Sequence, residues 1–267
     1  MNEVTFQKKI RDFYLDNYRS MPWRNGIKGE FDPYHITVSE MMLQQTQVHR
    51  VIPKYNEFIA KFPDIESLAK ASLQEVLQLW TSLGYNRRAK YLHEFASSVG
   101  SIENFPKTID KLIGYKGIGP NTAAAILVYS YNEPHLFIET NVRTVYINCF
   151  FADQEVVTDA EILTKLKQTI DSDNPREFYW GLMDYGTYLK KQGKGALSKS
   201  KSYKKQSKFA GSPRQLRGKV IKILSEKDST PVDVLDRSIQ DSRLSDVLIQ
   251  LETEGMIRVD GDQVMIA

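Results

Sequence analysis

The chain has 267 residues, of which 41% are hydrophobic and 26% charged, enough for one large core or for a main domain with a smaller one. Its single cysteine, Cys149, excludes a disulfide framework and a cysteine-ligated zinc or iron–sulfur site within one chain, and fits a reducing cytoplasm. The longest apolar run, residues 122–131, is too short to span a bilayer, and the first residues resemble no signal peptide. We therefore expect a cytoplasmic protein without a membrane segment.

The formal net charge of +3 hides an uneven distribution. Twelve Lys or Arg and no Asp or Glu lie between Lys190 and Lys222, whereas residues 223–267 hold four basic and ten acidic side chains. A basic segment between two acidic parts indicates polyanion binding. The charge pattern alone is explained equally well by a solvated flexible linker.

The apolar spacing predicts helices, and no strand, along residues 1–190. The first stripe, from Val4 to Tyr18, should end before Met21-Pro22-Trp23-Arg24, because proline lacks a backbone donor and restricts the residue before it. A polar loop over 25–33 follows. The further expected helices are 37–52, 54–61, 65–70, 73–80, 86–99, 108–113, 120–131, 139–150, 158–171 and 175–190.

The rest of the chain divides into a basic linker, 191–212, and a small domain, 213–267. The linker is rich in Lys, Ser and Gly and has no apolar periodicity. Beyond it, three helices are expected, followed by two short strands around Asp260-Gly261, which is a strong hairpin signal. Three helices and a hairpin predict a winged helix. The expected helices are 213–226, 231–238 and 242–254.

Residues 39–48 contain four consecutive polar side chains within an otherwise amphipathic helix. The polar run begins at Gln44 and Gln45, and Glu40 lies one helical turn earlier on the same face as Gln44. Amides at a concave surface can hydrogen-bond base edges and fill space between bases. Taken alone, the run is explained more simply by glutamines that bond buried backbone groups.

Gly117-Ile118-Gly119 separates two expected helices, and the second of them opens at Pro120, a favoured first residue. Backbone amides can converge at such glycines, and the following helix N-terminus adds its positive dipole, so a phosphate is the natural ligand. A Gly-x-Gly between two helices is typical of a helix–hairpin–helix, which holds the DNA backbone without reading sequence. A plain helix–helix corner is the alternative.

Glu139 and Asn141 stand just ahead of an expected helix whose Val142 and Val145 point inward. By itself, Glu139 is explained as an acid that stabilises the first turn of that helix. Elsewhere, Asp184 is expected to support helix packing and Cys149 to be a core residue.

Together these motifs resemble the helix–hairpin–helix DNA glycosylases, and within them the MutY-type adenine glycosylases. The resemblance covers about residues 8–190 and implies a mainly helical fold of two lobes with a DNA-binding cleft between them, followed here by the winged helix. It implies monofunctional hydrolysis of the N-glycosidic bond of adenine mispaired with 8-oxoguanine or guanine. The elements that match in order are Pro22-Trp23-Arg24, Pro33-Tyr34, the 39–48 run, Leu79-Trp80 to Tyr85, and Gly117-Ile118-Gly119.

The resemblance also implies roles for individual residues. Glu40 is similar in place to the acid that protonates the purine, Glu139 to an aspartate that stabilises the sugar cation, and Asn141 to the asparagine beside it. Tyr85, Gln44 and Gln45 match residues that enter the duplex while the target base is flipped out. Asn121 stands where bifunctional relatives resembling endonuclease III have a Schiff-base lysine, so strand nicking is not expected. The other residues expected at the DNA, besides Asn121, are Thr46, Arg87, Arg88, Lys116, Gly117, Gly119, Thr122, Lys204 and Lys205.

Three departures from the family pattern qualify this resemblance. Glu139 is one methylene longer than aspartate, which moves the carboxylate by up to ~1.5 Å, and errors of about 1 Å can cost ~100-fold in rate. The four cluster cysteines of the family are missing, and a basic segment from Lys190 to Lys208 stands in their place. We therefore expect no cofactor, no iron–sulfur cluster and no bound metal except a monovalent cation at the helix–hairpin–helix turn. The carboxyl-terminal domain that helps the family sense 8-oxoguanine is replaced by the acidic winged helix.

We expect a monomer that binds double-stranded DNA with a mispaired or damaged base and is associated with the nucleoid. The winged helix is expected to pack on the helical lobes or to bind another protein, because its candidate recognition helix, 242–254, is acidic and would repel phosphates. One alternative keeps the scaffold but excises thymine or uracil opposite guanine. The other is a non-catalytic binder of damaged DNA, which Glu139 favours and the retention of Glu40 and Asn141 disfavours.

Overall fold

The computed structural model describes residues 1–26, 29–204 and 206–267, which form two compact units. Each unit is assembled from separate stretches of the chain. The first comprises residues 1–36, 107–114 and 118–205, and the second comprises residues 37–106, 115–117 and 206–267. This division differs from the predicted boundaries at 190 and 213, because the carboxyl-terminal residues pack with the helices between 37 and 106. No helix in the described part of the chain is long and apolar enough to cross a membrane.

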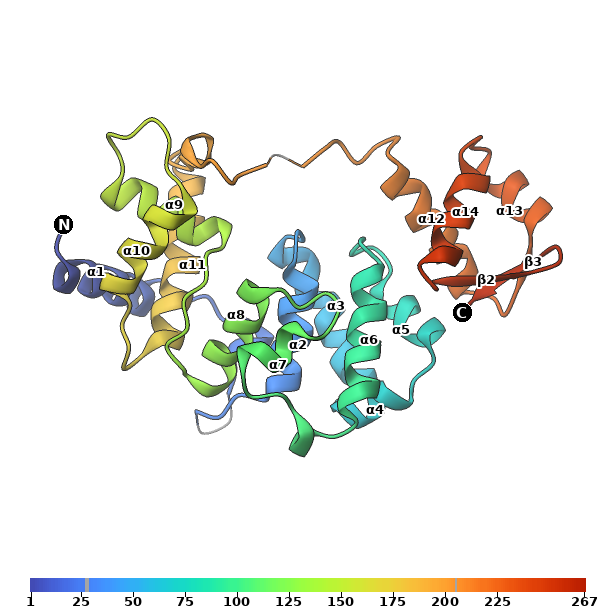
Figure 1. Ribbon diagram of the computed structural model, residues 1–267, viewed down its shortest axis with the longest axis horizontal. Coiled ribbons are helices and arrows are strands. Elements are labelled where there is room, and N and C mark those ends of the chain that lie inside the picture. Colours follow the sequence, from blue (N-terminus) through green and yellow to red (C-terminus); the bar gives the residue numbers. More distant parts are fainter. Residues whose placement is uncertain (27–28, 205) are drawn as a thin grey trace. The chain divides into compact units, whose positions relative to one another are not determined.

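The first unit is a helical bundle with an aromatic core. The helix α1 (Glu3–Asp16) packs against α10 (Asp159–Thr169) and α11 (Pro175–Lys191), and α11 also packs against α9 (Thr140–Phe150), as Figure 1 shows. The Phe6 ring of α1 is buried and makes edge contacts with three other rings, among them Tyr146 at 5.2 Å between centroids. The remaining helices of this unit are α7 (Ile109–Ile113), α8 (Pro120–Tyr131) and the short turns Pro22–Arg24 and Leu197–Lys199.

Part of the predicted linker is ordered in this unit. Ser200 forms an isolated parallel bridge with Val157, whose amide donates to the Lys199 carbonyl at 2.8 Å and whose carbonyl accepts from the Lys201 amide at 3.0 Å. Pairing through backbone atoms requires no apolar periodicity in the sequence. The composition of Lys, Ser and Gly therefore did not indicate this bridge.

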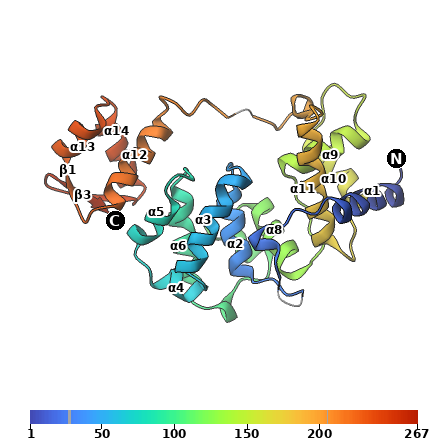
Figure 2. The ribbon, with the colours of Figure 1, turned by 180° about the vertical axis from the view of Figure 1, so that it is seen from behind.

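The second unit begins with a series of short helices, visible from behind in Figure 2. Two of them start in capping boxes, at Asp64 and Ser72, in which the cap side chain and the third helical residue bond each other's backbone amides. Their apolar faces enclose a core that includes Phe58 and Trp80. The helices are α2 (Pro33–Leu43), whose first turn is assigned to the first unit, α3 (Val48–Lys61), α4 (Ile65–Lys70), α5 (Leu73–Trp80), α6 (Arg87–Val99) and the turn Ile102–Asn104.

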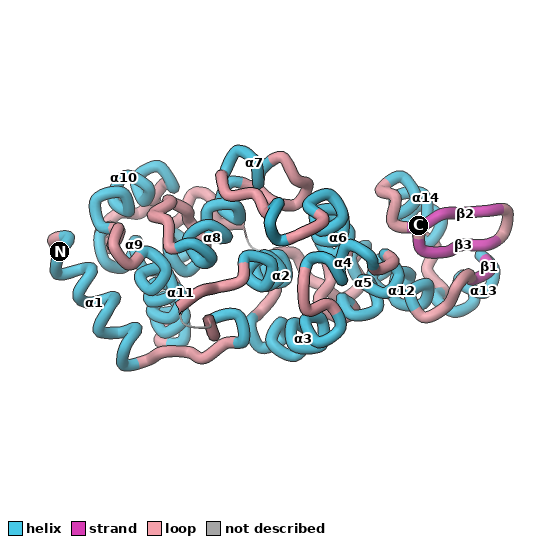
Figure 3. The backbone as a smooth tube through the Cα atoms, turned by 90° about the horizontal axis from the view of Figure 1, so that it is seen from below, coloured by secondary structure: helices cyan, strands magenta, loops and turns pink. Residues whose placement is uncertain are grey.

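The carboxyl-terminal domain of this unit has three helices and a three-stranded antiparallel sheet, drawn in magenta in Figure 3. The strand order is β1-β3-β2, and Val259 pairs with Val264 in the hairpin. The predicted hairpin is confirmed, whereas β1 was not predicted, because it has two residues and one is a proline. The elements are α12 (Pro213–Ser225), β1 (Thr230–Pro231), α13 (Val232–Ile239), α14 (Leu244–Thr253), β2 (Ile257–Asp260) and β3 (Gln263–Ile266).

The prediction of a mainly helical chain is confirmed, but the single helix expected over 37–52 is wrong. The chain leaves helical geometry after Leu43 and restarts at Val48, and Gln45 adopts a left-handed φ of 55°. The carbonyls of Met41 and Met42 accept hydrogen bonds from the Arg88 guanidinium at 2.8 and 2.9 Å. The Arg88 side chain, 46 or more residues away, therefore satisfies the last carbonyl groups of α2. The spacing of neighbouring residues cannot predict such a contact.

Candidate active site

Arg88 holds together the two turns that carry the residues predicted to enter DNA. It is 6% exposed, and burial lowers its pKa to about 10. Its guanidinium lies over the rings of Trp80 and Tyr85 at 5.5 and 5.4 Å. Its acceptors at 2.8 to 3.1 Å are the carbonyls of Met41, Met42 and Gly84 and the Thr46 hydroxyl, and it also donates to the Gln44 carbonyl. The structure thus places Arg88 inside the unit as a support for both turns, not at the surface position that a predicted DNA contact implies.

The side chains of Gln45 and Tyr85 lie together on the surface of the second unit. Both residues have left-handed backbone angles, with φ of 55° and 50°. Gln206 donates to the Gln45 side-chain oxygen at 3.2 Å and also to the Tyr85 hydroxyl. Arg214 donates to the same hydroxyl, with its guanidinium 5.1 Å from the Tyr85 ring centroid. The structure thus brings two of the predicted DNA-entering residues together and adds two neighbours from the carboxyl-terminal residues.

The turn between α7 and α8 has the features of a helix–hairpin–helix. Gly117 has a φ of +84°, and a Cβ built on it would lie 2.8 Å from Tyr91 Cδ2 and 3.0 Å from Met41 Cε, so only glycine fits. Its carbonyl accepts from Gln44 Nε2 at 3.1 Å, which ties the turn to the end of α2. Gly119 caps α8, Pro120 is its first residue, and Lys116, Gly117 and Gly119 are exposed, while Thr122 is half-buried. An exposed helix N-terminus next to a lysine can take a phosphate.

Glu40 lies on α2, one turn before Gln44, and is 8% exposed. Its role as the acid that protonates the purine stays a prediction.

The segment that leads to Glu139 is fixed by Asn121. The Asn121 side chain donates to the Ile138 carbonyl at 3.0 Å and accepts from the Ile138 amide at 3.4 Å. One residue earlier, the Phe137 amide donates to the Tyr179 hydroxyl at 3.1 Å. The structure gives the Asn121 side chain two backbone bonds that position the segment leading to the predicted catalytic carboxylate, and its predicted DNA contact stays a prediction.

Glu139 is the N-cap residue of α9, but its side chain makes no capping bond. Burial raises the pKa of its carboxyl group, and the positive charges of Arg143 and Lys190 act in the opposite direction. Arg143 is itself held by Asp159 through two bonds of 2.8 and 2.7 Å. A desolvated carboxylate flanked by two cations can face a developing positive charge.

Two residues of the neighbouring helix α11, Lys190 and Gly186, contact Asn141. Lys190 Nζ donates to Asn141 Oδ1 at 2.7 Å, and burial lowers the pKa of this lysine, while Glu139 opposes the shift. A Cβ on Gly186 would lie 2.8 Å from the Asn141 carbonyl oxygen. Asn141 Nδ2 lies 3.6 Å from Met183 Sδ. The pair Glu139 and Asn141 therefore sits in a site built by α9 and α11.

The sequence analysis missed Gly186 and Lys190, although their spacing carried a signal. Met183, Gly186 and Lys190 recur at three and four residues along α11, so they share one helix face. A glycine inside a helix lowers helix stability by about 1 kcal/mol relative to alanine. Its presence within α11 therefore indicates a close approach of another group, such as the one made here by Asn141. The charge pattern places Lys190 only in the basic segment.

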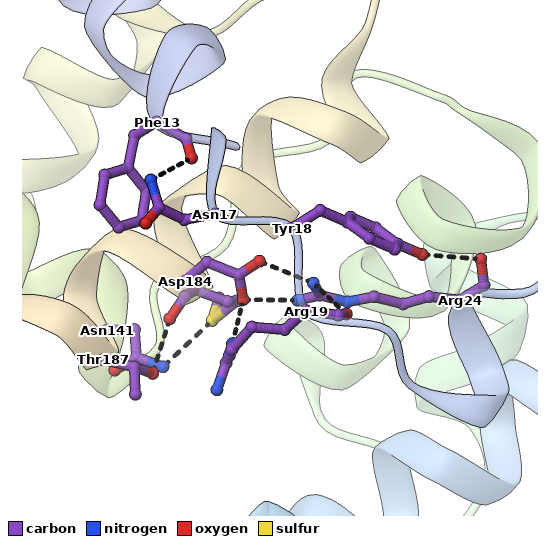
Figure 4. Close-up of polar contacts among 9 residues, drawn as sticks. Phe13, Asn17, Tyr18, Arg19, Arg24, Asn141, Asp184 and Thr187 are labelled. Carbon is purple, nitrogen blue, oxygen red and sulfur yellow. Dashed lines mark hydrogen bonds and ion pairs between the residues drawn. The ribbon is translucent and has the colours of Figure 1, made fainter. Parts of the chain in front are cut away.

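Asp184 supports packing, as predicted. It is 3% exposed and accepts from Arg24 at 2.8 and 3.1 Å and from Arg19 at 2.6 Å, which Figure 4 shows together with Asn141 and Thr187. This ion-pair cluster joins α11 to the segment after α1 within the first unit. Buried charges of this kind tolerate loss of a partner poorly.

The residues of the chain do not fit the iron–sulfur cluster of the resembled family. Cys149 is half-buried on α9, with Lys9 Nζ at 3.9 Å from its sulfur, so the core position predicted for it is only half right. In the described ranges, no three His, Cys, Asp or Glu side chains gather as a metal site would require. The basic segment that stands in place of the cluster is exposed at Lys204, while Lys205 lies outside the described residues.

A helix–hairpin–helix followed by a half-buried carboxylate and an asparagine at the start of α9 defines the class of a helix–hairpin–helix DNA glycosylase. Residues 38–171 match the HhH-GPD superfamily of base excision DNA repair proteins. The chain belongs to this family, and the resemblance found in the sequence is confirmed.

Similar proteins support this membership. The chain is 31% identical to the adenine DNA glycosylase of Mycolicibacterium smegmatis over 95% of this chain and 96% of that protein. It is 33% identical to the adenine DNA glycosylase of Buchnera aphidicola subsp. Baizongia pistaciae over 71% of this chain and 54% of that protein, so it spans about half the length of this relative. Among solved structures, a thermostable thymine-DNA glycosylase is similar, with 25% identity and a TM-score of 0.61 over 69% of this chain and 85% of that one.

Proposed function

We propose that the chain is a monofunctional DNA glycosylase that removes adenine mispaired with 8-oxoguanine or guanine. The observation that carries the proposal is the half-buried pair Glu139 and Asn141, held by Asn121, Lys190 and Gly186, in a chain of this repair family. The choice of adenine rests on the names of the relatives, one of which aligns over 95% of the chain.

The chemistry follows from the charges that develop when a purine leaves a sugar. Glu40 would donate a proton to the purine, at N7, while the bond between C1′ and N9 breaks and the electron pair leaves with the base. The sugar becomes an oxocarbenium ion, and the Glu139 carboxylate would stabilise it or bond to C1′ for a short time. Addition of water at C1′ then releases a proton and gives the abasic sugar, so that free adenine and an abasic site are the products.

Strand cleavage is not part of the proposed activity. A Schiff base would need a free amine near C1′, and Asn121 supplies none because its side chain is a carboxamide, whose nitrogen is not nucleophilic. The ammonium group of Lys190 is bonded to Asn141 and is drawn electrostatically to Glu139. We therefore expect cleavage of the product only after alkali, and no covalent complex on borohydride treatment.

The test is single-turnover release of adenine from 8-oxoguanine:adenine and guanine:adenine duplexes, followed by alkali. Glu40→Gln should abolish release, whereas Glu57→Gln, an exposed substitution on α3, should leave the rate unchanged. Release of thymine or uracil from guanine mispairs, with none of adenine, would replace the proposed substrate. Tight binding without release from any of these duplexes would show a binder and refute the enzyme.

The remaining predictions about ligands and partners belong to this proposal. Double-stranded DNA is the expected partner, and the protein is expected to act as a monomer in the cytoplasm, associated with the nucleoid. A monovalent cation at the helix–hairpin–helix turn and a protein partner at the acidic α14 are the two further candidates. No other cofactor is expected.

A further inference from the structure

A groove of about 450 Å³ lies in the second unit between the turn 81–86 and helix α12. Gln45 and Tyr85, two of the residues predicted to enter DNA, line it on one side. Of the described residues that line the groove, none is acidic and four are basic. These four are Arg50, Arg214, Lys219 and Lys222.

The groove combines exposure with uncompensated charge. Arg50, Lys219 and Lys222 are exposed, and no ion pair among the described residues includes any of the four basic side chains. The neighbouring Arg217 and Arg87 differ, because both are paired with Glu254. Positive charge is therefore concentrated at the groove and neutralised beside it.

The helix α12 places these groups because its two faces differ. Leu216, Val220 and Leu224 are buried in the carboxyl-terminal domain, and Gln74 of α5 donates to the Lys227 carbonyl at 3.1 Å just beyond the helix. The opposite face turns Lys219 and Lys222 to the surface, three residues apart. Arg214, at the start of the helix, lies 5.1 Å from the Tyr85 ring and 5.4 Å from that of Phe209.

We propose that this groove binds the phosphodiester backbone of DNA beside the point where Gln45 and Tyr85 enter the duplex. Polyanion binding needs exposed Lys and Arg outside ion pairs and carries no sequence information, which matches a groove lined, among the described residues, by basic and amide side chains and by no carboxylate. The carboxyl-terminal domain thus contacts DNA through α12, while its acidic α14 stays away from phosphates. The inference rests on the proposed function, since it takes a DNA duplex as the ligand.

The test compares two double variants of the full chain. Lys219→Gln with Lys222→Gln removes two groove charges, and Arg237→Gln with Arg258→Gln removes two exposed charges elsewhere in the same domain. Binding to a fluorescent 8-oxoguanine:adenine duplex is measured by anisotropy between about 50 and 200 mM salt. The groove variant should lower the slope of log K against log salt by about 1.8 and weaken binding at 0.1 M salt by up to about 60-fold, since each phosphate contact contributes about 0.9 to the slope.

The control variant should keep the wild-type slope. Equal slopes for the two double variants would overturn the inference, whatever the activity. A lowered slope in the groove variant, with no base released by the wild type, would support the groove and refute the proposed enzyme.

Discussion

Replacing Arg88 by lysine tests whether this residue supports the turns or contacts DNA. Lysine keeps the positive charge but offers three donors from one atom, whereas the guanidinium serves six acceptors, four of them at 2.8 to 3.1 Å. Even without the long contact to the Leu83 carbonyl at 3.5 Å, at least two acceptors lose their donor. At about 1–3 kcal/mol for each unsatisfied buried group, Arg88→Lys should lower the free energy of unfolding by about 2–6 kcal/mol.

The assay is urea unfolding followed by far-ultraviolet circular dichroism, with hydrogen exchange of peptides that cover residues 40–48 and 80–90. Arg87→Lys is the matched control, because the Arg87 side chain is 56% exposed and its change should stay within about 0.5 kcal/mol. The variant should also exchange faster in both turns. Equal stability of the two variants would refute a supporting role. A phosphate contact at Arg88 would instead leave stability unchanged, because lysine also binds phosphate.

Three further substitutions address the site in the first unit. Lys190→Met removes a positive charge that lowers the pKa of Glu139, so this pKa should rise further. The acidic limb of the single-turnover rate against pH should then move to higher pH, and Lys190→Arg should return the limb to its wild-type position. A limb that does not move would contradict the electrostatic role of Lys190. Gly186→Ala should lower the stability of the protein by about 1–3 kcal/mol in thermal unfolding, because the new Cβ would lie 2.8 Å from the Asn141 carbonyl oxygen. Helix propensity alone predicts a gain in stability, and such a gain would argue against the close approach. Asp184→Asn leaves two arginines without a charged partner and should cost about 3 kcal/mol in urea unfolding, and a loss below about 1 kcal/mol would show that the cluster is not stabilising.

The sequence predicted those features that are encoded by neighbouring residues. Helix spacing, the hairpin at Asp260-Gly261 and the turn at Gly117 all follow from local chemistry, and the structure has each of them. The break after α2 could not be predicted, because it depends on Arg88, which is distant in sequence. For Lys190, the spacing along α11 indicates the helix face but not the partner, because its contact with Asn141 spans 49 residues. Local patterns therefore predict the helices, the turns and the candidate carboxylates. The side chains that hold these elements in place, such as Arg88 and Lys190, reach them through long-range packing, which local patterns do not show.

The interleaving of the two units has a consequence for the order in which the protein can fold during synthesis. Helix α1 leaves the ribosome long before its partners α10 and α11, which are among residues 159–191. The apolar face of α1, with Phe6 and Ile10, cannot be buried by these partners until more than half of the chain has been synthesised. In the second unit, α5 likewise gains its contacts with α12 only after residue 213 has emerged. The helices made early therefore need protection from aggregation until the late ones arrive. The first unit has all of its residues once residue 205 is made, whereas the second needs residues up to 267, so slowed elongation beyond residue 205 should let the first unit fold before the second.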